Sequence, residues 1–195
     1  MDLLYDAAVA WNRLLQDRYE ITYGKNKKLH TIVLEFQTGE FYHLAGFPHA
    51  KDIALPLRGS QSKMLANVLT GKITGAMLEK STNYETIIKR KLEAIIRLEQ
   101  LLSSPCQVYL YNPRKLPFYT DIKAKYLLVD AQTQVVFLFT DTEDNNGLCF
   151  SRSTFVMGDR DFRINQTRLA VLQIKRTDLS TGNTDVIFCK EGFLN

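Results

Sequence analysis

The segment FYHLAGFPHAKDI, from Phe41 to Ile53, is the most informative part of this chain. It holds two of the three histidines, together with a lysine and an aspartate. Glycine adopts the left-handed backbone conformation without a steric penalty, so Gly46 is expected to end a helix. The pattern predicts a short helical turn over residues 39–44 and a bend over residues 47–51, with one histidine on each side of the glycine.

His43 and His49 have two interpretations. Histidine titrates near neutral pH, so a pair flanking a bend suits acid–base chemistry or contact with phosphate. The alternative is structural, with His43 as a half-buried ring bonded to a backbone carbonyl and His49 as a surface residue. Composition alone favours the structural alternative.

Upstream of this segment, the pattern predicts a helix and a β-hairpin. Asp2 can cap a helix that runs to about residue 17, with Trp11 on its apolar stripe as a packing anchor. Strand patterns over 18–23 and 29–36 predict the hairpin. The lysines between these strands can contact phosphate, but a solvated hairpin tip is the commoner explanation of such a cluster.

Two longer helices are predicted downstream. The first is capped by Ser60 or Ser62. A capping box formed by Thr82 and Glu85 opens the second, which ends near residue 102. The basic residues of this second helix are placed largely on its outer face, among glutamates. They are Lys89, Arg90, Lys91 and Arg97. The mixed signs of charge favour a solvated face over a nucleic-acid-binding face.

The remainder of the chain is predicted to form antiparallel strands. The continuous apolar run from Val135 to Phe139 is typical of a central strand. In the strand around Arg152, alternation places Arg152 and Thr154 on one face and Ser153 on the other. The predicted strands are 107–111, 123–129, 134–140, 148–157, 166–177 and 185–190.

Composition indicates one globular domain. The chain has 195 residues, of which 45% are apolar and 24% charged, which is enough to bury a core without disulfides or metals. We expect a single domain over 1–195 that is helix-rich over 1–104 and forms a sheet over 105–195. The net charge of +4 permits an RNA partner but does not demand one.

Cysteine and acidic patterns predict neither a metal site nor a disulfide framework. The chain has three cysteines, far apart, and no cluster with zinc-ligand spacing. The acidic loop 141–147 lacks the spacing of a calcium loop and is interpreted as solvent-exposed. No cofactor is expected, because phosphate-binding loops and the common hydrolase and kinase motifs do not occur.

Targeting signals are also not predicted. The first residues lack a basic start and a long apolar run, and no apolar segment approaches the ~20 residues that span a bilayer. The expected location is the cytoplasm, away from membranes.

Several short motifs occur in an order that resembles a known family. An F-x-H-L-x-G-F segment at 41–47 is followed by the pair Asp52-Ile53 and by L-x-G-K-I at 69–73. A long charged helix comes next, and then R-S-x-F at 152–155. Over roughly residues 29–189 this order resembles the phage-associated branch of the barnase–EndoU–colicin–RelE (BECR) nuclease superfamily.

The resemblance implies an α+β fold in which N-terminal helices and a hairpin precede a curved antiparallel sheet. It also implies metal-independent RNA cleavage by residues on that sheet. His43 and the pair Arg152-Ser153 are the positions that match the family. The family pattern does not assign the roles of base and acid.

Metal-free cleavage of RNA needs a group that takes the 2′-hydroxyl proton, one that protonates the leaving oxygen, and a cation near the phosphorane. We take His43, Arg152 and Ser153 as catalytic candidates, with Arg152 as the phosphate clamp. Arg152 is a functional residue if its face is buried and an ordinary edge charge if its face is solvated. The candidates for substrate binding are His49, Lys51, Gln166 and Thr167.

The leading hypothesis is an endoribonuclease that acts as a toxin or effector of a phage or mobile element, with RNA and an inhibitor or antitoxin protein as partners. One alternative is an inactive nuclease-fold module that binds RNA or a protein. Another is a host-targeting interaction protein. Convergence of His43, Arg152 and a basic rim of Lys51 and Lys72 in one cleft favours the enzyme. Scattering of these residues, or a pair between Arg152 and an internal carboxylate, favours a binding module.

Overall fold

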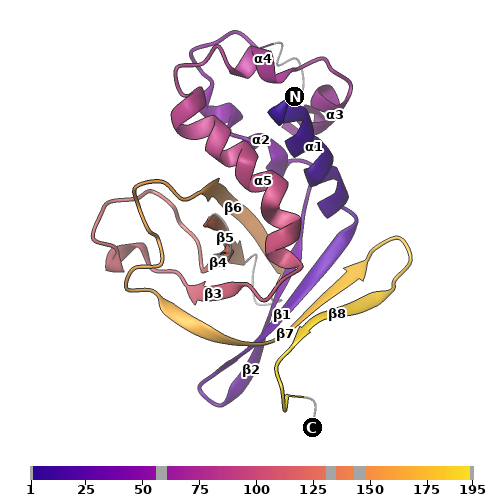
Figure 1. Ribbon diagram of the computed structural model, residues 1–195, viewed down its shortest axis with the longest axis vertical. Helices are drawn as coiled ribbons and strands as arrows, with labels where there is room; N and C mark the ends of the chain where they lie inside the picture. The colour runs from indigo at the N-terminus through magenta and orange to yellow at the C-terminus, as the bar shows by residue number, and fades with distance from the viewer. Residues whose placement is uncertain (1, 56–60, 131–134, 143–147, 194–195) are drawn as a thin grey trace.

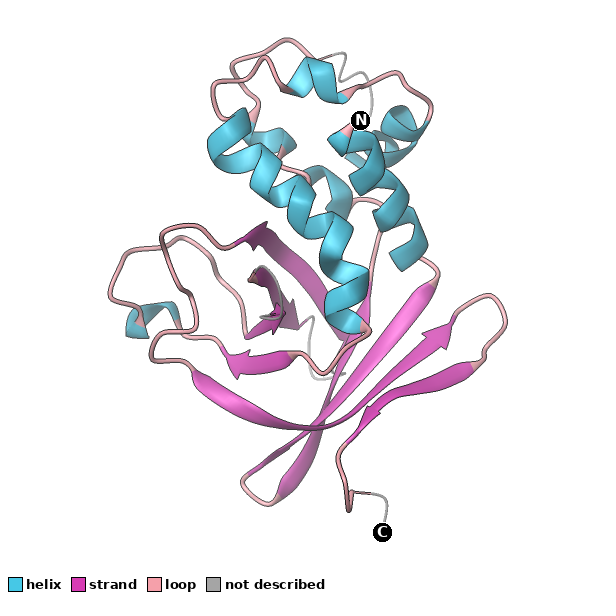
Figure 2. Cartoon of the chain, in the orientation of Figure 1, coloured by secondary structure: helices cyan, strands magenta, loops and turns pink. Residues whose placement is uncertain are grey.

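Helices gather at one end of the molecule and strands at the other (Figures 1 and 2). The computed structural model describes residues 2–55, 61–130, 135–142 and 148–193. Ser60, the turn after Asp130 and most of the acidic loop lie outside these ranges. Within them, no helix is both long and apolar enough to cross a bilayer.

The helical end follows the apolar periodicity of the sequence. Asp2 caps the first helix as predicted, because its Oδ1 accepts the Tyr5 N–H at 3.0 Å. Trp11 is fully buried, as expected, and meets Phe36 edge to face at 5.1 Å. The helices are α1 (Leu3–Leu14), α2 (Glu40–Leu44), α3 (Met64–Leu69), α4 (Gly75–Leu78) and α5 (Lys89–Leu102), with short turns η1 (Phe47–His49), η2 (Gln61–Lys63), η3 (Tyr84–Ile88) and η4 (Pro113–Lys115).

The predicted cap at Ser62 is wrong. Ser62 lies inside η2, and Lys63 occupies the N-cap position of α3 without a side-chain hydrogen bond. The short turn before α3 brings the chain into the helix through helical backbone angles, so the extended conformation that a capping serine needs does not occur there.

Seven strands close into a barrel, and an eighth lies beside one of them. The sheet order is β1-β2-β6-β5-β4-β3-β7-β8, and β1 also pairs with β7. The barrel therefore has no open edge between β1 and β7. The strands are β1 (Asp17–Lys25), β2 (Lys28–Glu35), β3 (Gln107–Leu110), β4 (Tyr126–Asp130), β5 (Val136–Thr142), β6 (Leu148–Val156), β7 (Thr167–Asp178) and β8 (Thr184–Cys189).

The mixture of helices and strands agrees with the predicted α+β class, but the description of a curved antiparallel sheet that follows the hairpin is wrong in detail, because seven strands close into a barrel. The N-terminal hairpin belongs to the sheet, and β2 pairs with β6 in parallel through Val33–Leu148 and Leu34–Cys149. Alternation shows which side chains face a core, but it does not show which strand edges meet. The twist of the strands brings β1 and β7 together.

β5 is buried on both faces over residues 136–140, as the apolar run from Val135 to Phe139 predicted, and its neighbour β4 is buried throughout. Leu128 and Leu138 face a core shared with α1 and α5. Phe137 and Phe139 face a second core, to which Phe162 also belongs. Partly buried side chains of the segment 116–124 pack against this core, as do Phe155 and Met157. This second core lies next to the site described below.

The hairpin between β1 and β2 turns through Asn26 and Lys27, both with positive φ (50° and 60°). Two central residues with positive φ define a type I′ turn, whose preferred sequence is Asn-Gly. Lys27 therefore occupies a conformation that a side chain disfavours.

Replacement Lys27→Gly is expected to stabilise the protein by about 1 kcal/mol, because glycine adopts this conformation without the Cβ penalty. The measurement is the thermal midpoint, which is expected to rise by roughly 2–4 °C. Lys28→Gly, in the adjoining strand, is the control and is expected to lower it. A lower midpoint for Lys27→Gly would contradict the turn assignment.

Candidate functional site

The two histidines of the central segment lie on either side of a left-handed glycine, as predicted. Gly46 has φ +87° and separates α2 from η1. A Cβ at Gly46 would lie 3.2 Å from the Lys91 Cδ, so the missing side chain also allows close packing against α5. Phe41 and Phe47 anchor the segment in the core, while His43 and His49 reach solvent.

Lys91 on α5 is buried beneath these histidines. The residue is 7% exposed, and its Nζ donates to the Ser153 Oγ at 3.2 Å. Burial lowers the pKa of Lys91 to about 8. A buried ammonium in contact with a serine hydroxyl is a group that can respond to a nearby phosphate.

The assignment of Lys91 to the outer face of its helix was therefore wrong. Lys91 follows the buried Ile88 by three residues and precedes the buried Ile95 by four, which places it on the inner face. This spacing is visible in the sequence. A lysine on an apolar stripe was the signal that would have identified it.

β6 contains an extra residue at Arg152. Opposite β5, Ser151 pairs with Thr140 and Ser153 pairs with Phe139, so Arg152 is the unpaired residue of a β-bulge. The predicted alternation is wrong from this point onward, since Thr154 is fully buried while Arg152 is exposed. The bulge turns Arg152 toward solvent and leaves the next residue, Ser153, within reach of Lys91.

A glutamate of α2 holds the bulge against the helix that carries His43. The Glu40 Oε1 accepts the Ser151 N–H at 2.7 Å, and its Oε2 accepts the Gln37 N–H at 2.9 Å. One carboxylate therefore fixes both the start of α2 and the residue next to Arg152. Hydrogen bonds of a charged acceptor are among the stronger ones in proteins.

Arg152 itself is held by two contacts. Its guanidinium lies over the Phe150 ring at 4.3 Å, and its Nη2 is 3.6 Å from the Asp141 Oδ2. The Arg152 side chain is 49% exposed and that of Asp141 28% exposed. Solvent screens a pair of this kind, so it contributes at most about 1 kcal/mol and can yield to a phosphate.

Four of the candidate residues meet in one groove of about 430 Å³, which lies between η1, α5 and β6. They are His43, His49, Arg152 and Ser153, and Lys91 and Lys123 line the same groove. Asp121 is the acidic side chain in the lining. Burial of the ring, the charge on Lys91 and the charge on Lys51, in that order, lower the pKa of His49.

Three of the predicted binding residues do not line this groove. Lys51, two residues after His49, is exposed, and its positive charge helps to lower the pKa of His49. Thr167 is exposed at the start of β7. Gln166 joins two loops, because its Oε1 accepts the Asn112 N–H at 2.7 Å and its Nε2 donates to the Asn112 carbonyl at 3.2 Å.

The predicted capping box of Thr82 and Glu85 is wrong: Thr82 holds the histidine segment instead, and Glu85 pairs with Lys89. The Asp52 carboxylate accepts the Ser81 hydroxyl at 2.7 Å, and the Thr82 N–H and hydroxyl at 2.7 and 2.8 Å. These bonds lower the pKa of Asp52 to about 2. Asn83 donates to the His49 carbonyl at 2.9 Å, and the helix then opens with the π-turn η3.

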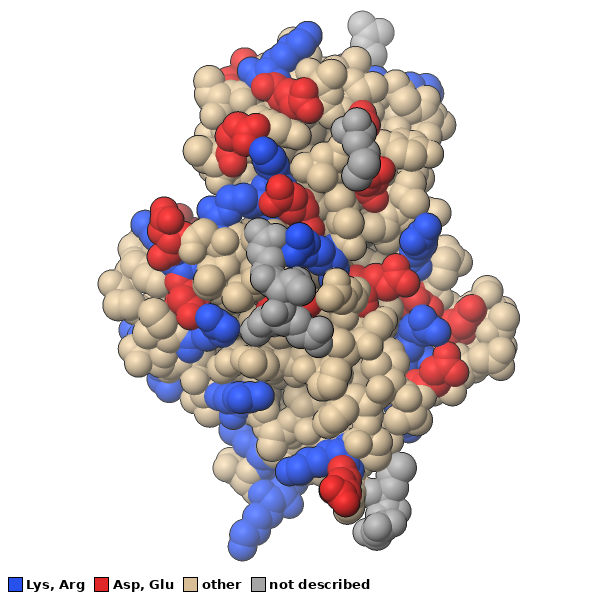
Figure 3. Space-filling model, viewed as in Figure 1, with Lys and Arg blue, Asp and Glu red and all other residues tan. Residues whose placement is uncertain are grey.

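The face drawn in Figure 3 carries both signs of charge, with lysine and arginine side chains interspersed among acidic ones over much of it. Among the residues that the structure describes, no three His, Cys, Asp or Glu side chains gather in a metal-ligating group. Cys149 is buried, and burial raises the pKa of its thiol to about 11.

Replacement Lys91→Met is expected to stabilise the protein at pH 7 by about 1–3 kcal/mol, because it removes a buried charge while keeping the volume. The pKa of Lys91 is about 8 in the folded state and 10.5 ordinarily, so between these values the unfolded chain binds the extra proton. Stability of the unmodified protein therefore rises with pH over this window, and the advantage of the variant shrinks.

The measurement is chemical denaturation at pH 7 and pH 10. Lys89→Met is the control, because the Lys89 side chain is 40% exposed and pairs with Glu85 on the surface of the same helical segment. It is expected to change stability by under about 0.5 kcal/mol at pH 7. A Lys91→Met variant less stable than the unmodified protein at pH 7 would contradict the burial of a charged amine.

A comparison with protein-family models places these observations in context. A model described as "phage-Barnase-EndoU-ColicinE5/D-RelE like nuclease4" matches residues 3–191. The match spans the helical end, the barrel and the groove between them. No curated protein and no solved structure matches the chain.

Proposed function

We propose that this chain, which belongs to the phage-Barnase-EndoU-ColicinE5/D-RelE like nuclease family, is a metal-independent endoribonuclease that acts as a toxin or effector of a phage or mobile element. The observation that carries the proposal is the groove in which His43, His49 and Arg152 surround the buried Lys91. Two imidazoles and two cations supply every group that phosphodiester cleavage by a neighbouring hydroxyl requires.

The pKa of His49 supports its role as the base. A base must be unprotonated, and both burial and the charge of Lys91 lower the pKa of His49. His49 takes the proton of the ribose 2′-hydroxyl, and the 2′-oxygen forms a bond to phosphorus. His43 then gives a proton to the 5′-oxygen as the bond between phosphorus and that oxygen breaks, which leaves a 2′,3′-cyclic phosphate.

Lys91 and Arg152 stabilise the negative charge that develops on the phosphoryl oxygens. With a pKa of about 8, Lys91 is largely protonated at pH 7. Its contact with Ser153 keeps the ammonium next to the bulge that presents Arg152. Preorganised cations stabilise a phosphorane more than a mobile surface charge does. The 2′-hydroxyl nucleophile makes RNA the substrate and excludes DNA.

The pair between Arg152 and Asp141 supports a second function. An arginine that already has a carboxylate partner fits a nuclease-fold module that binds RNA or a protein without cleaving it. The two functions differ in a single measurement, because a binding module retains affinity for RNA and releases no cyclic phosphate. An inhibitor or antitoxin protein remains an expected partner of the active form.

The decisive experiment is cleavage of a mixed-sequence RNA in the presence of EDTA. We expect the unmodified protein to cleave and His43→Ala, His49→Ala and Arg152→Ala each to lose at least 100-fold in rate, which is the usual scale for acid–base and electrostatic groups. His30→Ala and Arg168→Ala are the matched controls, since both residues lie outside the groove. The controls are expected to retain activity.

Each outcome has one meaning. Cleavage that survives the groove substitutions would overturn the site assignment. Activity that disappears with EDTA would overturn the metal-independent mechanism. RNA binding without cleavage would favour the binding module.

The dependence of kcat/KM on pH tests the assigned roles. Below neutrality, kcat/KM is expected to rise with pH as His49 loses its proton, because the pKa of His49 is lowered from its usual 6.5. It is expected to fall above about pH 8 as Lys91 loses its proton. Lys91→Arg keeps the positive charge at higher pH, so the fall in kcat/KM should shift to higher pH. If the fall occurs at the same pH in this variant, the loss of the Lys91 proton is not its cause.

A further inference from the structure

An apolar pocket of about 500 Å³ adjoins the groove and shares four residues with it. The shared residues are His49, Lys91, Ile122 and Ser153. The two cavities therefore form one continuous depression, with proton-transfer and cationic groups at one end. The other end is different in chemistry, because aromatic and aliphatic side chains line it.

The floor of the apolar pocket is aromatic. Phe155, the third residue after the Arg152 bulge, is half-buried, and Phe162 is 7% exposed. Their ring centroids are 5.3 Å apart, and both pack against Phe137 and Phe139 of the second core. Ile87 of η3 lines the pocket as well. The rings are thus held in place from below.

One wall of the pocket is an anchored arginine. The Arg90 Nε and Nη2 both donate to the Val156 carbonyl, at 3.1 and 2.7 Å, and its guanidinium lies 5.9 Å from the Phe155 ring centroid. Gly158 permits this position, because a Cβ there would lie 2.7 Å from Nη2. Arg90 therefore offers a fixed, planar, charged surface.

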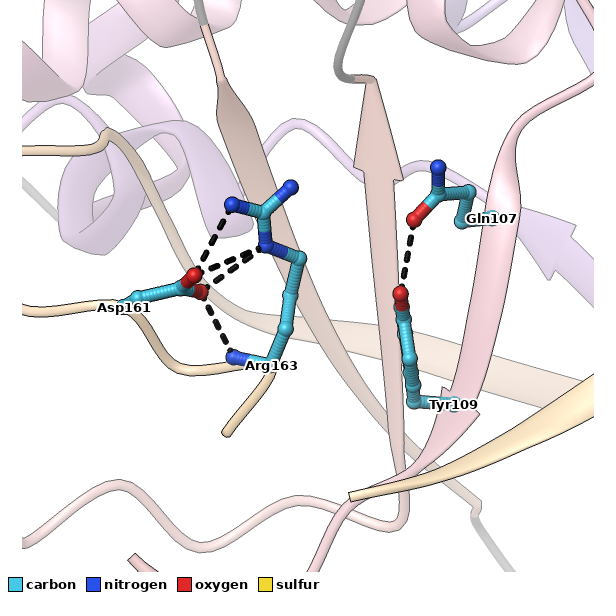
Figure 4. A network of polar contacts seen from close by, with 4 residues as sticks. All are labelled: Gln107, Tyr109, Asp161 and Arg163. Atoms are coloured by element: carbon cyan, nitrogen blue, oxygen red, sulfur yellow. Dashed lines mark hydrogen bonds and ion pairs between the residues drawn. The ribbon is translucent and has the colours of Figure 1, made fainter. Parts of the chain in front are cut away.

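The loop that carries Asp159, Arg160 and Phe162 also lines the pocket. Arg160 lies over the Phe118 ring at 5.2 Å and donates to the Tyr119 carbonyl at 3.2 Å. Figure 4 shows how the next residues brace this loop: the Asp161 carboxylate accepts both the guanidinium and the backbone N–H of Arg163, at 2.8 to 3.1 Å. The turn that presents Phe162 is therefore fixed by its own ion pair.

We propose that this apolar pocket binds a nucleobase of the substrate, next to the phosphate that occupies the groove. A planar ring with polar edges and an attached phosphate fits the combination of an aromatic floor, flat guanidinium walls and adjoining cations. Bases stack on aromatic and arginine surfaces in many single-strand binding sites. The inference rests on the proposed function, since it takes the groove as the phosphate site.

The test is binding of the nucleoside 3′- and 5′-monophosphates of the four RNA bases, compared with inorganic phosphate, by NMR titration. At least one nucleotide is expected to bind roughly tenfold more tightly than phosphate, within the range for base stacking on an aromatic ring. Phe155→Leu keeps the apolar volume without the aromatic face and should remove most of this advantage, while phosphate binding stays unchanged.

A second variant avoids the core. Thr86→Trp places a large side chain at an exposed residue in the lining of the pocket and should exclude the base. Gln100→Trp, at an exposed residue of α5 outside the pocket, is the matched control and should bind as the unmodified protein does. The thermal midpoints of all three variants establish that they fold.

Equal affinity for every nucleotide and for phosphate would overturn the proposal, as would no binding of any nucleotide at millimolar concentration. A nucleotide advantage that persists in both Phe155→Leu and Thr86→Trp would overturn it too. The result for nucleotide binding is separable from the result for RNA cleavage. A base-dependent affinity without RNA cleavage supports the pocket and contradicts the nuclease, whereas cleavage without base-dependent affinity does the opposite.

Discussion

The pairing of β1 with β7 is the constraint on which the rest of the structure depends. It joins Asp17–Gly24 to Ala170–Asp178, near the two ends of the chain, and converts a curved sheet into a closed barrel. Closure removes the open edge between the first and last strands of the ring. It also fixes β6, which lies between β2 and β5, beneath α2 and α5. The groove therefore forms where the helical end meets the barrel.

At that junction, a few polar contacts hold parts of the chain that are distant in sequence. Glu40 joins α2 to the β6 bulge, Lys91 joins α5 to Ser153, and Asp52 joins the histidine segment to the residues just before η3. Lys91 is buried and Glu40 is half-buried, whereas Asp52 is exposed. Buried charged groups are costly without partners, so the contacts of Lys91 and Glu40 favour one arrangement of the helices on the barrel.

Three irregular features lie close to the groove or to the pocket that adjoins it. They are the bulge at Arg152, the left-handed Gly46 and the π-turn at the start of the long helix. Each departs from the regular repeat of its element and changes the direction of a side chain or a segment. Regular strands and helices form the supports, and the departures lie beside the candidate residues of the site.

The sequence by itself determined the helix stop at Gly46, the buried Trp11, the β1–β2 hairpin and the central position of β5, because these follow from local backbone preference and apolar spacing. It also indicated His43, Arg152 and Ser153 as candidates through the order of short motifs. Lys91 was detectable from its spacing but was hidden by its basic neighbours. Only the tertiary structure decided the closure of the barrel, the bulge at Arg152 and the role of Asp52. Strand pairing, register and contacts between distant segments depend on the shape of the assembled chain, and no local pattern encodes them.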